Sequence, residues 1–330
     1  MTSFPSPAHA EQPLRKNLIY TVVLDAPGAE GYRFLGKMLV SSLLRTFFTG
    51  DIVVFRNCEN PLFLVERKGL EEVYVETPQI IGQAGAEQAW CWKYKVAEML
   101  DVRGYDKVLF LDADCLALRN VDDLLEGDYD IAYQVERKAR GDQQSFNGFY
   151  TEEEMARAAQ RDGVNSGTLA IRAEIFHDVM REWERIDTGE MARPENGFRD
   201  QASWNALLMR CSDRFTEQGL AREKAAGWPG GGGGGGSDQS SVISNQMGAA
   251  VTDDRSLITD HSPRWEARPF TMGEIQFPMY ADPHFRSYTK AALTHNCGGD
   301  TLEKIRMTYG LYMQTFFCDE SGLFFSMLEM

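Results

Sequence analysis

The sequence predicts an α/β fold with a mostly parallel central sheet, and three observations support this prediction. Apolar strand-like segments alternate with segments of helical period through the first two hundred residues. Val108 to Leu111 is apolar without alternation, which is typical of a strand covered on both faces. No low-complexity stretch divides this part of the 330-residue chain. We therefore expect one extended core, with the strand 107–111 in the middle of the sheet.

Residues 1–16 are rich in Pro, Ser and Gln, which favours a disordered N-terminal segment. The fold is expected to begin with the β-branched run 18–24. Apolar residues then recur at helical spacing through residues 32–48. Further strands are predicted at 52–55 and 73–75, and further helices at 61–68 and 87–100.

After the central strand, the chain continues to alternate. Asn120 is placed to cap a short helix over residues 121–125, whose first turn is acidic. The remaining patterns predict strands at 130–134 and 167–171 and helices at 151–161, 173–186 and 199–209.

Seven consecutive glycines, Gly230 to Gly236, form a segment that cannot build a packed element. Residues 229–241 are therefore expected to be a flexible linker, either natural or an engineered replacement of a loop. Short strands at 256–259 and 274–277 and a helix at 302–316 are predicted beyond it. Residues 17–330 would then be one domain that this linker interrupts.

Asp112 and Asp114 follow the central strand directly, with only Ala113 between them. In extended chain, residues i and i+2 point to the same side, so both carboxylates can converge on one hard cation. The carboxyl end of a central parallel strand is where open α/β sheets place ligands. The pattern indicates a metal and phosphate site.

The formal net charge of −15 disfavours nucleic acid and anionic membranes as partners, since both attract clustered Lys and Arg. No apolar run approaches the ~18 residues that cross a bilayer, and the N-terminus lacks the pattern of a signal peptide. A cytoplasmic protein is expected. The six cysteines form no CxxC pair and are expected to be reduced core thiols rather than zinc ligands.

The C-terminal aromatic segment, with Phe316, Phe317, Phe324 and Phe325, lacks basic residues after Arg306. It is expected to pack on the domain or on a second subunit in a homodimer, rather than on a bilayer.

Five motifs, in this order, resemble those of the glycogenin-like, family 8 retaining glycosyltransferases. They are the strand 18–24 followed by Tyr32, the helix segment Tyr94-Lys95-Val96, the DxD segment 105–125, Asn165-Ser166-Gly167, and Asp200-Gln201. The resemblance covers about residues 18 to 210. It implies a GT-A fold and metal-dependent transfer of a hexose, with retention, from UDP-glucose or UDP-galactose to an acceptor that the sequence does not identify.

The resemblance also implies roles for individual residues. Asp200 and Gln201 would lie in the catalytic region. Asp112, Asp114 and His295 would hold the metal, and this O,O,N set suits Mn²⁺ or Mg²⁺, with the nitrogen favouring Mn²⁺. The implied donor-binding residues are Leu24, Asp25, Tyr32, Lys95, Asp112, Ala113, Asp114, Asn165, Ser166, Gly167 and Gly298.

The family's C-terminal motif, HxxGxxKPW, is only partly present. His295 and Gly298 match its His and Gly, but Thr301 stands where the phosphate-binding Lys would be, and no Pro-Trp follows. Lys304 or Arg306 could supply the missing cation, or each could be a solvated helix residue.

Two other functions stay open. The DxD could serve a Mg²⁺-dependent phosphatase or nucleotidyltransferase, although the Thr or Val and the Gly of haloacid-dehalogenase-type phosphatases are absent. The chain could also be an inactive GT-A fold that acts as a binding module. Several site residues also have local explanations: Asp200 as a helix cap, Lys95 as a surface lysine, and Tyr32 as a packing residue.

Overall fold

A computed structural model of the chain describes eleven segments. These are residues 16–24, 31–63, 67–76, 91–140, 149–158, 162–189, 199–211, 265–270, 275–276, 292–295 and 301–317. Residues 1–15 of the predicted N-terminal segment, the glycine-rich linker, the predicted strand at 256–259, and Phe324 and Phe325 of the aromatic C-terminus lie outside the described residues, whereas Lys16 already belongs to the first strand.

The core of the fold is a seven-stranded sheet with the order β3-β2-β1-β4-β7-β6-β8. Its strands are β1 (Lys16–Val23), β2 (Asp51–Arg56), β3 (Leu70–Tyr74), β4 (Tyr105–Leu111), β6 (Ile131–Arg140), β7 (Asp162–Arg172) and β8 (Ala267–Pro269). Only β7 pairs antiparallel with its neighbours, so the sheet is mostly parallel, as predicted. The strand with the continuous apolar run, β4, lies in the middle.

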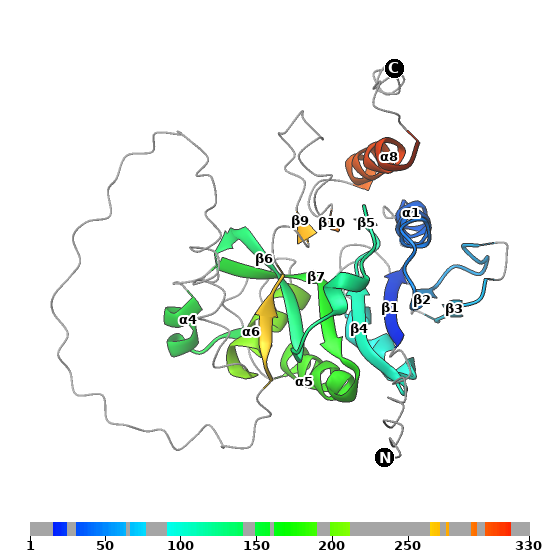
Figure 1. Ribbon diagram of the computed structural model, residues 1–330. Coiled ribbons are helices and arrows are strands. Elements are labelled where there is room, and N and C mark those ends of the chain that lie inside the picture. Colours follow the sequence, from blue (N-terminus) through cyan, green and yellow to red (C-terminus); the bar gives the residue numbers. More distant parts are fainter. Residues whose placement is uncertain are drawn as a thin grey trace, which may run out of the picture.

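Helices cover both faces of this sheet (Figure 1). On one face, α1 (Tyr32–Arg45) packs on β1 and lies beside α8 (Thr301–Phe317). On the other face lie α5 (Phe176–Thr188) and α6 (Arg199–Cys211), which pack against each other. The fold is therefore a three-layer α/β/α arrangement, which requires the strands between the layers to be apolar on both sides.

The α5–α6 face is closed by large aromatic side chains. Trp183 and Trp204 are fully buried, with ring centroids 4.8 Å apart, and Tyr94 packs on Trp183 from α3 (Trp92–Lys95). A short 3₁₀ helix, η1 (Val96–Met99), continues α3. The helix predicted over 87–100 is thus described as a turn of α-helix that tightens into 3₁₀ geometry.

Three short strands form a second sheet beside α8 with the order β5-β10-β9 (Figure 1). These are β5 (Cys115–Ala117), β9 (Ile275–Gln276) and β10 (Leu293–His295). β10 pairs antiparallel with β5, immediately after the DxD motif. Neither β5 nor β10 was predicted, because three-residue strands carry too little periodicity.

The remaining helices follow local signals. α4 (Glu152–Ala158) begins with a capping box. The Glu154 carboxylate accepts from the backbone N–H of Thr151, and the Thr151 hydroxyl accepts from the backbone N–H of Glu154. In η2 (Asp122–Leu125), the side-chain oxygen of Asn120 accepts from the backbone N–H of Asp122, but the cap position is Val121, one residue later than predicted. The η4 turn (Ala173–Ile175) leads into α5.

The helix predicted at 61–68 is wrong for the residues that are described. Residues 61–63 are not helical, and Arg67 forms a β-bridge with Leu70. The carboxylate of Glu72 on β3 accepts from the backbone N–H groups of Leu62 and Phe63. This tertiary contact satisfies donors that a helix start would otherwise leave unpaired.

Within the described segments, no helix combines the length and apolarity needed to span a bilayer.

Candidate functional site

The two carboxylates of the DxD motif lie at the carboxyl end of β4. The strand ends at Leu111, and the backbone N–H of Asp112 donates to the Gly167 carbonyl at 2.8 Å, which ties the turn to β7. The side chain of Asp112 is 28% exposed, whereas that of Asp114 is only 4% exposed. One carboxylate therefore borders solvent and the other is buried beneath it.

β10 brings His295 to these carboxylates from 180 residues further along the chain. Because His295 pairs with Cys115 in the β5–β10 ladder, its ring lies over the turn. Its Nε2 is 3.3 Å from Asp114 Oδ1 and 3.7 Å from Asp112 Oδ2. The three residues implied as metal ligands thus converge.

The Asn165-Ser166-Gly167 segment is an irregularity within β7 rather than the loop before a strand. In the ladder between β6 and β7, Tyr133 of β6 pairs with Leu169, but the next residue of β6, Gln134, pairs with Asn165. The three residues between are bulged out of the β6 ladder, and the Asn165 side-chain oxygen accepts from the Gly167 N–H at 2.7 Å. Bulges of this kind re-aim side chains, here toward the tip of β4.

Gly167 is needed for a close approach. A Cβ built at this position would lie 2.1 Å from His295 Cε1 and 2.5 Å from Asp112 Oδ2. No side chain other than hydrogen fits between the histidine ring and the carboxylate.

The first turn of α6 supplies Asp200 and Gln201, both buried. Ser166 Oγ donates to Asp200 Oδ2 at 2.7 Å, and Asn165 Nδ2 donates to Gln201 Oε1 at 3.2 Å. The two predicted motifs therefore contact each other side chain to side chain.

Lys93, not Lys95, reaches the cluster from α3. The Lys93 ammonium lies 2.7 Å from Asp200 Oδ2 and 3.1 Å from Asp112 Oδ1, and its side chain is buried. Lys95 is exposed, with its ammonium 5.8 Å from the centroid of the Trp92 ring. Positions i and i+2 of a helix face different sides, so the phase of α3 decides which lysine points inward. The sequence signal that could have identified Lys93 is that the residues three and four positions later, Val96 and Ala97, are both apolar, as on the inner face of a helix.

Lys304 of α8 lies at the other side of the carboxylates. Its ammonium is 2.6 Å from Asp114 Oδ2 and 3.1 Å from the Tyr32 hydroxyl, while Arg306 is exposed. Of the two cations that the sequence left open, Lys304 is the one within the cluster. Tyr32 joins the cluster through this contact.

The mutual contacts perturb the acidity of these groups. Burial raises the pKa of Asp112, and the neighbouring Lys93 only partly opposes this. Burial also acts to raise the pKa of Asp114, but Lys304 and His295 outweigh it, so the pKa of Asp114 is lowered. For Lys93 and Lys304 burial lowers the pKa, but the adjacent carboxylates outweigh it, and both pKa values are raised. Both ammonium groups are therefore charged at neutral pH.

The ligand atoms present fit a divalent cation. Asp114 Oδ1 is buried, and no described residue donates it a hydrogen bond of good geometry, although His295 Nε2 is close. With all three carboxylates ionised, the two ammonium groups leave one negative charge in excess. The Cys115 thiol is also near, because its sulfur, a carboxylate oxygen of Asp114 and a ring nitrogen of His295 lie within 4.8 Å of one another. Oxygen and imidazole ligands are the set that Mn²⁺ accepts.

The other predicted site residues are placed differently. Leu24 and Ala113 are buried in the two apolar cores that flank the sheet. Asp25 and Gly298 lie outside the described residues. Of the cysteines in the described residues, Cys91, Cys115 and Cys211 are buried and Cys58 is partly exposed.

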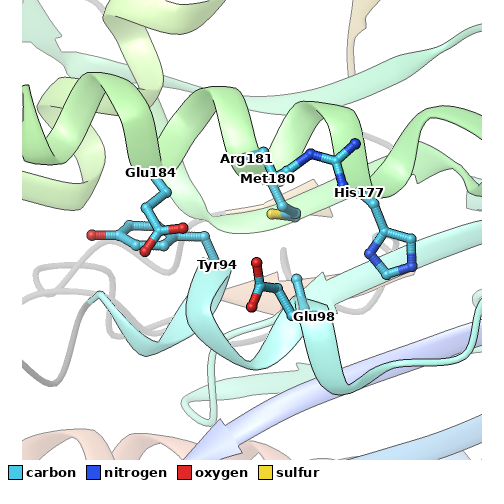
Figure 2. Close-up of a pocket in the computed structure, with 7 residues that line it drawn as sticks. Tyr94, Glu98, His177, Met180, Arg181 and Glu184 are labelled. Atoms are coloured by element: carbon cyan, nitrogen blue, oxygen red, sulfur yellow. The ribbon is translucent and has the colours of Figure 1, made fainter.

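A small cavity of about 10 Å³ lies away from this cluster, between η1 and α5. Figure 2 shows Glu98 on η1 and His177, Arg181 and Glu184 on α5 at its wall. Its volume is that of about one water molecule. None of the predicted site residues lines it, so it adds no ligand site to the cluster.

Comparison with known proteins adds no assignment to this geometry. A scan against protein-family models finds no match to the chain, and a search of curated proteins finds none either. The function is therefore inferred from the residues of the site and from the sequence motifs.

Proposed function

We propose that the protein is a metal-dependent retaining glycosyltransferase that moves a hexose from a UDP-sugar, UDP-glucose or UDP-galactose, to an acceptor. The observation that carries this proposal is the convergence of separate stretches of chain on the tip of β4. Asp112 and Asp114 meet His295, the Asn165-Ser166-Gly167 bulge and the first turn of α6 there. The site lies at the carboxyl end of a central strand, where α/β sheets bind ligands.

Asp112, Asp114 and His295 would hold the cation. A bound Mn²⁺ or Mg²⁺ would stabilise the negative charge that develops on the departing diphosphate. The excess negative charge of the cluster becomes an excess positive charge when a divalent cation is added. The loaded site would then match an anionic diphosphate, which the carboxylates alone would repel.

Lys304 would bind phosphate oxygens in place of the lysine that the family motif puts after its glycine. The ammonium already lies beside Asp114, and its second partner is the neutral hydroxyl of Tyr32. Because it lies beside a predicted metal ligand, the Lys304 ammonium would be placed to bind a phosphate of the donor together with the cation. Lys93 has two carboxylate partners, so its role would be to hold Asp112 and Asp200 in place.

Asn165, Asp200 and Gln201 would orient the hexose. Amide and carboxylate groups together can donate to and accept from sugar hydroxyls. In the proposed reaction, the acceptor oxygen bonds to the anomeric carbon on the face from which the diphosphate leaves. The bond from that carbon to the phosphate oxygen breaks, and the acceptor proton passes to the leaving phosphate. Gln201, which Asn165 holds, would lie on this face.

A donor screen tests the proposal. The purified chain is incubated with UDP-, GDP- and dTDP-sugars and Mn²⁺, and nucleotide release is measured with and without chelator. We expect release of UDP from UDP-glucose or UDP-galactose that requires the metal. The anomeric proton of any product is then assigned by NMR and should show the α configuration. The matched control is Asp178→Asn, a substitution on the exposed face of α5.

Three outcomes would overturn it. Release from GDP- or dTDP-sugars alone would refute the donor, and a β-linked product would refute retention. Metal-dependent phosphatase activity without any turnover of UDP-sugars would instead favour an Asp112-dependent phosphatase. UDP and Mn²⁺ binding without turnover of any donor would favour a binding module.

A further inference from the structure

A glutamine that the sequence analysis did not select touches the histidine of the cluster. Gln134 lies on β6, is 3% exposed, and its Oε1 is 3.1 Å from His295 Nδ1. It faces the same side of the sheet as Ala132, which packs in the core beneath β10. It is also the residue that pairs with Asn165 at the bulge. Gln134 therefore joins the bulge to His295.

The two nitrogens of the neutral histidine ring cannot both carry a proton, and this couples Gln134 to Asp114. If the proton is on Nδ1, it is donated to Gln134 Oε1, and the Nε2 lone pair faces the carboxylates. Asp114 Oδ1, 3.3 Å from Nε2, is then a buried acceptor that faces another acceptor. That arrangement is favourable only with a cation between them.

If the proton is on Nε2, it can be donated to Asp114 Oδ1 instead. His295 Nδ1 then needs a donor. Gln134 can supply one, because rotating its amide by about 180° exchanges the oxygen and the nitrogen. The Nε2 group of Gln134 is buried and has no acceptor among the described residues, so the rotation loses only the contact between Oε1 and His295 Nδ1, which a contact from the amide nitrogen to the same Nδ1 replaces.

We propose that Gln134 is a positioning residue that selects the tautomer of His295: its amide donates to Nδ1 without metal, and its oxygen accepts from Nδ1 when Nε2 binds the cation. This inference rests on the metal site of the proposed function. An amide is the side chain suited to this role, since it is both donor and acceptor. A carboxylate at position 134 would always accept from Nδ1 and so would fix the metal-binding tautomer of His295. An apolar side chain would support neither tautomer.

Two substitutions of similar size test the proposal in opposite directions. Gln134→Glu should tighten Mn²⁺ binding by about tenfold and weaken the metal-free fold, because its carboxylate keeps Nε2 unprotonated beside Asp114. Gln134→Leu should weaken Mn²⁺ binding about 10- to 100-fold, the range found when an outer partner of a metal-binding histidine is lost. Titration calorimetry gives the affinities, and thermal melts in chelator give the metal-free stability. Equal Mn²⁺ affinity in wild type and Gln134→Leu would overturn the proposal.

Nitrogen NMR of the histidine ring supplies a readout that does not depend on metal or activity. Spectra are recorded at about pH 8.5, where an ordinary imidazole is neutral, and the His295 signals are assigned by their loss in His295→Gln. Without metal, wild type should carry the proton on Nε2 and Gln134→Glu on Nδ1. The same tautomer in both proteins would contradict the role of Gln134. Failure of wild type to bind Mn²⁺, with the tautomer difference intact, would reject the metal site and leave the link between Gln134 and His295 standing.

Discussion

Charged side chains are buried near both ends of β4, but the groups that they contact differ. Near the amino end, Lys107 is 1% exposed, donates to the Tyr129 carbonyl at 3.0 Å and lies 4.4 Å from the centroid of the Tyr129 ring. At the carboxyl end, three carboxylates, two ammonium groups and a histidine ring contact one another.

The difference separates a structural charge from a functional cluster. The single ammonium of Lys107 has a carbonyl and an aromatic face as partners, and burial lowers its pKa, so it can be balanced without a ligand. With its three carboxylates ionised, the cluster has one excess negative charge, and the buried Asp114 Oδ1 receives no hydrogen bond of good geometry from the described residues, although His295 Nε2 is 3.3 Å away. Buried polar atoms are normally satisfied, so this imbalance is what a ligand would correct.

The largest expected effect on ligand binding and sugar transfer is at Asp114. Asp114→Asn keeps the size of the side chain but removes a ligand charge, so Mn²⁺-dependent UDP binding and sugar transfer should be lost. With Mn²⁺ present, UDP at a hundred times its dissociation constant should stabilise the wild type by about 2.7 kcal/mol, and the variant should show no such stabilisation in a thermal-shift assay. The control Lys107→Met, near the other end of β4, should keep the stabilisation by UDP and Mn²⁺. Full retention of the ligand shift in Asp114→Asn would reject the metal assignment.

Lys93→Met should produce the largest loss of stability. It leaves Asp112 and Asp200 without their shared cation, and removing one partner of a buried ion pair costs about 3–5 kcal/mol. Denaturant unfolding in chelator measures this loss. Added Mn²⁺ should restore part of it, because the cation replaces some of the missing positive charge. A loss below about 1 kcal/mol would show that the two carboxylates are solvated in the native protein.

Gly167→Ala should disturb the cluster by sterics alone. The added methyl group meets the His295 ring and Asp112, and overpacking of this kind typically costs about 1–3 kcal/mol. The measurement is Mn²⁺ affinity together with the melting temperature in chelator. We expect both to fall. A variant with unchanged Mn²⁺ affinity would mean that His295 and Asp112 do not approach each other at Gly167.

Lys107→Met should have a smaller effect, and its size should depend on pH. Loss of the donor to the Tyr129 carbonyl costs about 1–3 kcal/mol. Burial lowers the pKa of Lys107 in the folded protein, so in alkaline solution the unfolded chain binds a proton that the folded chain has lost. Wild-type stability therefore gains from this group as pH rises between the folded and the ordinary lysine pKa. Lys107→Met lacks this gain, and parallel stability curves for the two proteins would contradict the shift.

The smallest effect is expected on the exposed face of α5. Asp178 and Arg181 form an ion pair with both side chains more than half exposed. Asp178→Asn should change stability by less than about 0.5 kcal/mol, since exposed ion pairs contribute little. A chemical-denaturation curve that shifts by more than 1 kcal/mol would mean that charge on this helix face matters more than its exposure indicates.

Much of the fold was predictable because strand and helix periods are local properties. Apart from the helix at 61–68 and the unpredicted strand β5, the order of strands and helices through residue 211 follows the predicted alternation, and β4 lies in the middle of the sheet as expected. The antiparallel direction of β7 was not predicted, because direction depends on the connection and not on the apolar pattern. The helix at 61–68 failed because a long-range contact with Glu72 decides that backbone.

Site residues that belong to short sequence motifs were predictable. Residues that reach the site only through tertiary packing were not. The Asp112, Asn165 and Asp200 motifs are short strings at element ends, and the structure brings them together. Choosing Lys93 over Lys95 requires the phase of a short helix. Choosing Lys304 over Arg306 requires the packing of α8. Gln134 carried one usable signal, its place as the last residue of the strand predicted at 130–134, directly after Ile131, Ala132 and Tyr133.

The pairing of β10 with β5 also sets an order of events during synthesis. Residues 16–211 supply six of the seven strands of the sheet, both DxD carboxylates, Lys93 and Asp200, and they leave the ribosome before His295 and Lys304. His295 and Lys304 emerge last and must close a loop of nearly two hundred residues, a contact that long-range entropy makes slow. A chain that lacks β10 and α8 would hold the DxD carboxylates in an incomplete cation site. Under the proposed function, sugar transfer would require that His295 and Lys304 have been synthesised and have packed against the DxD turn.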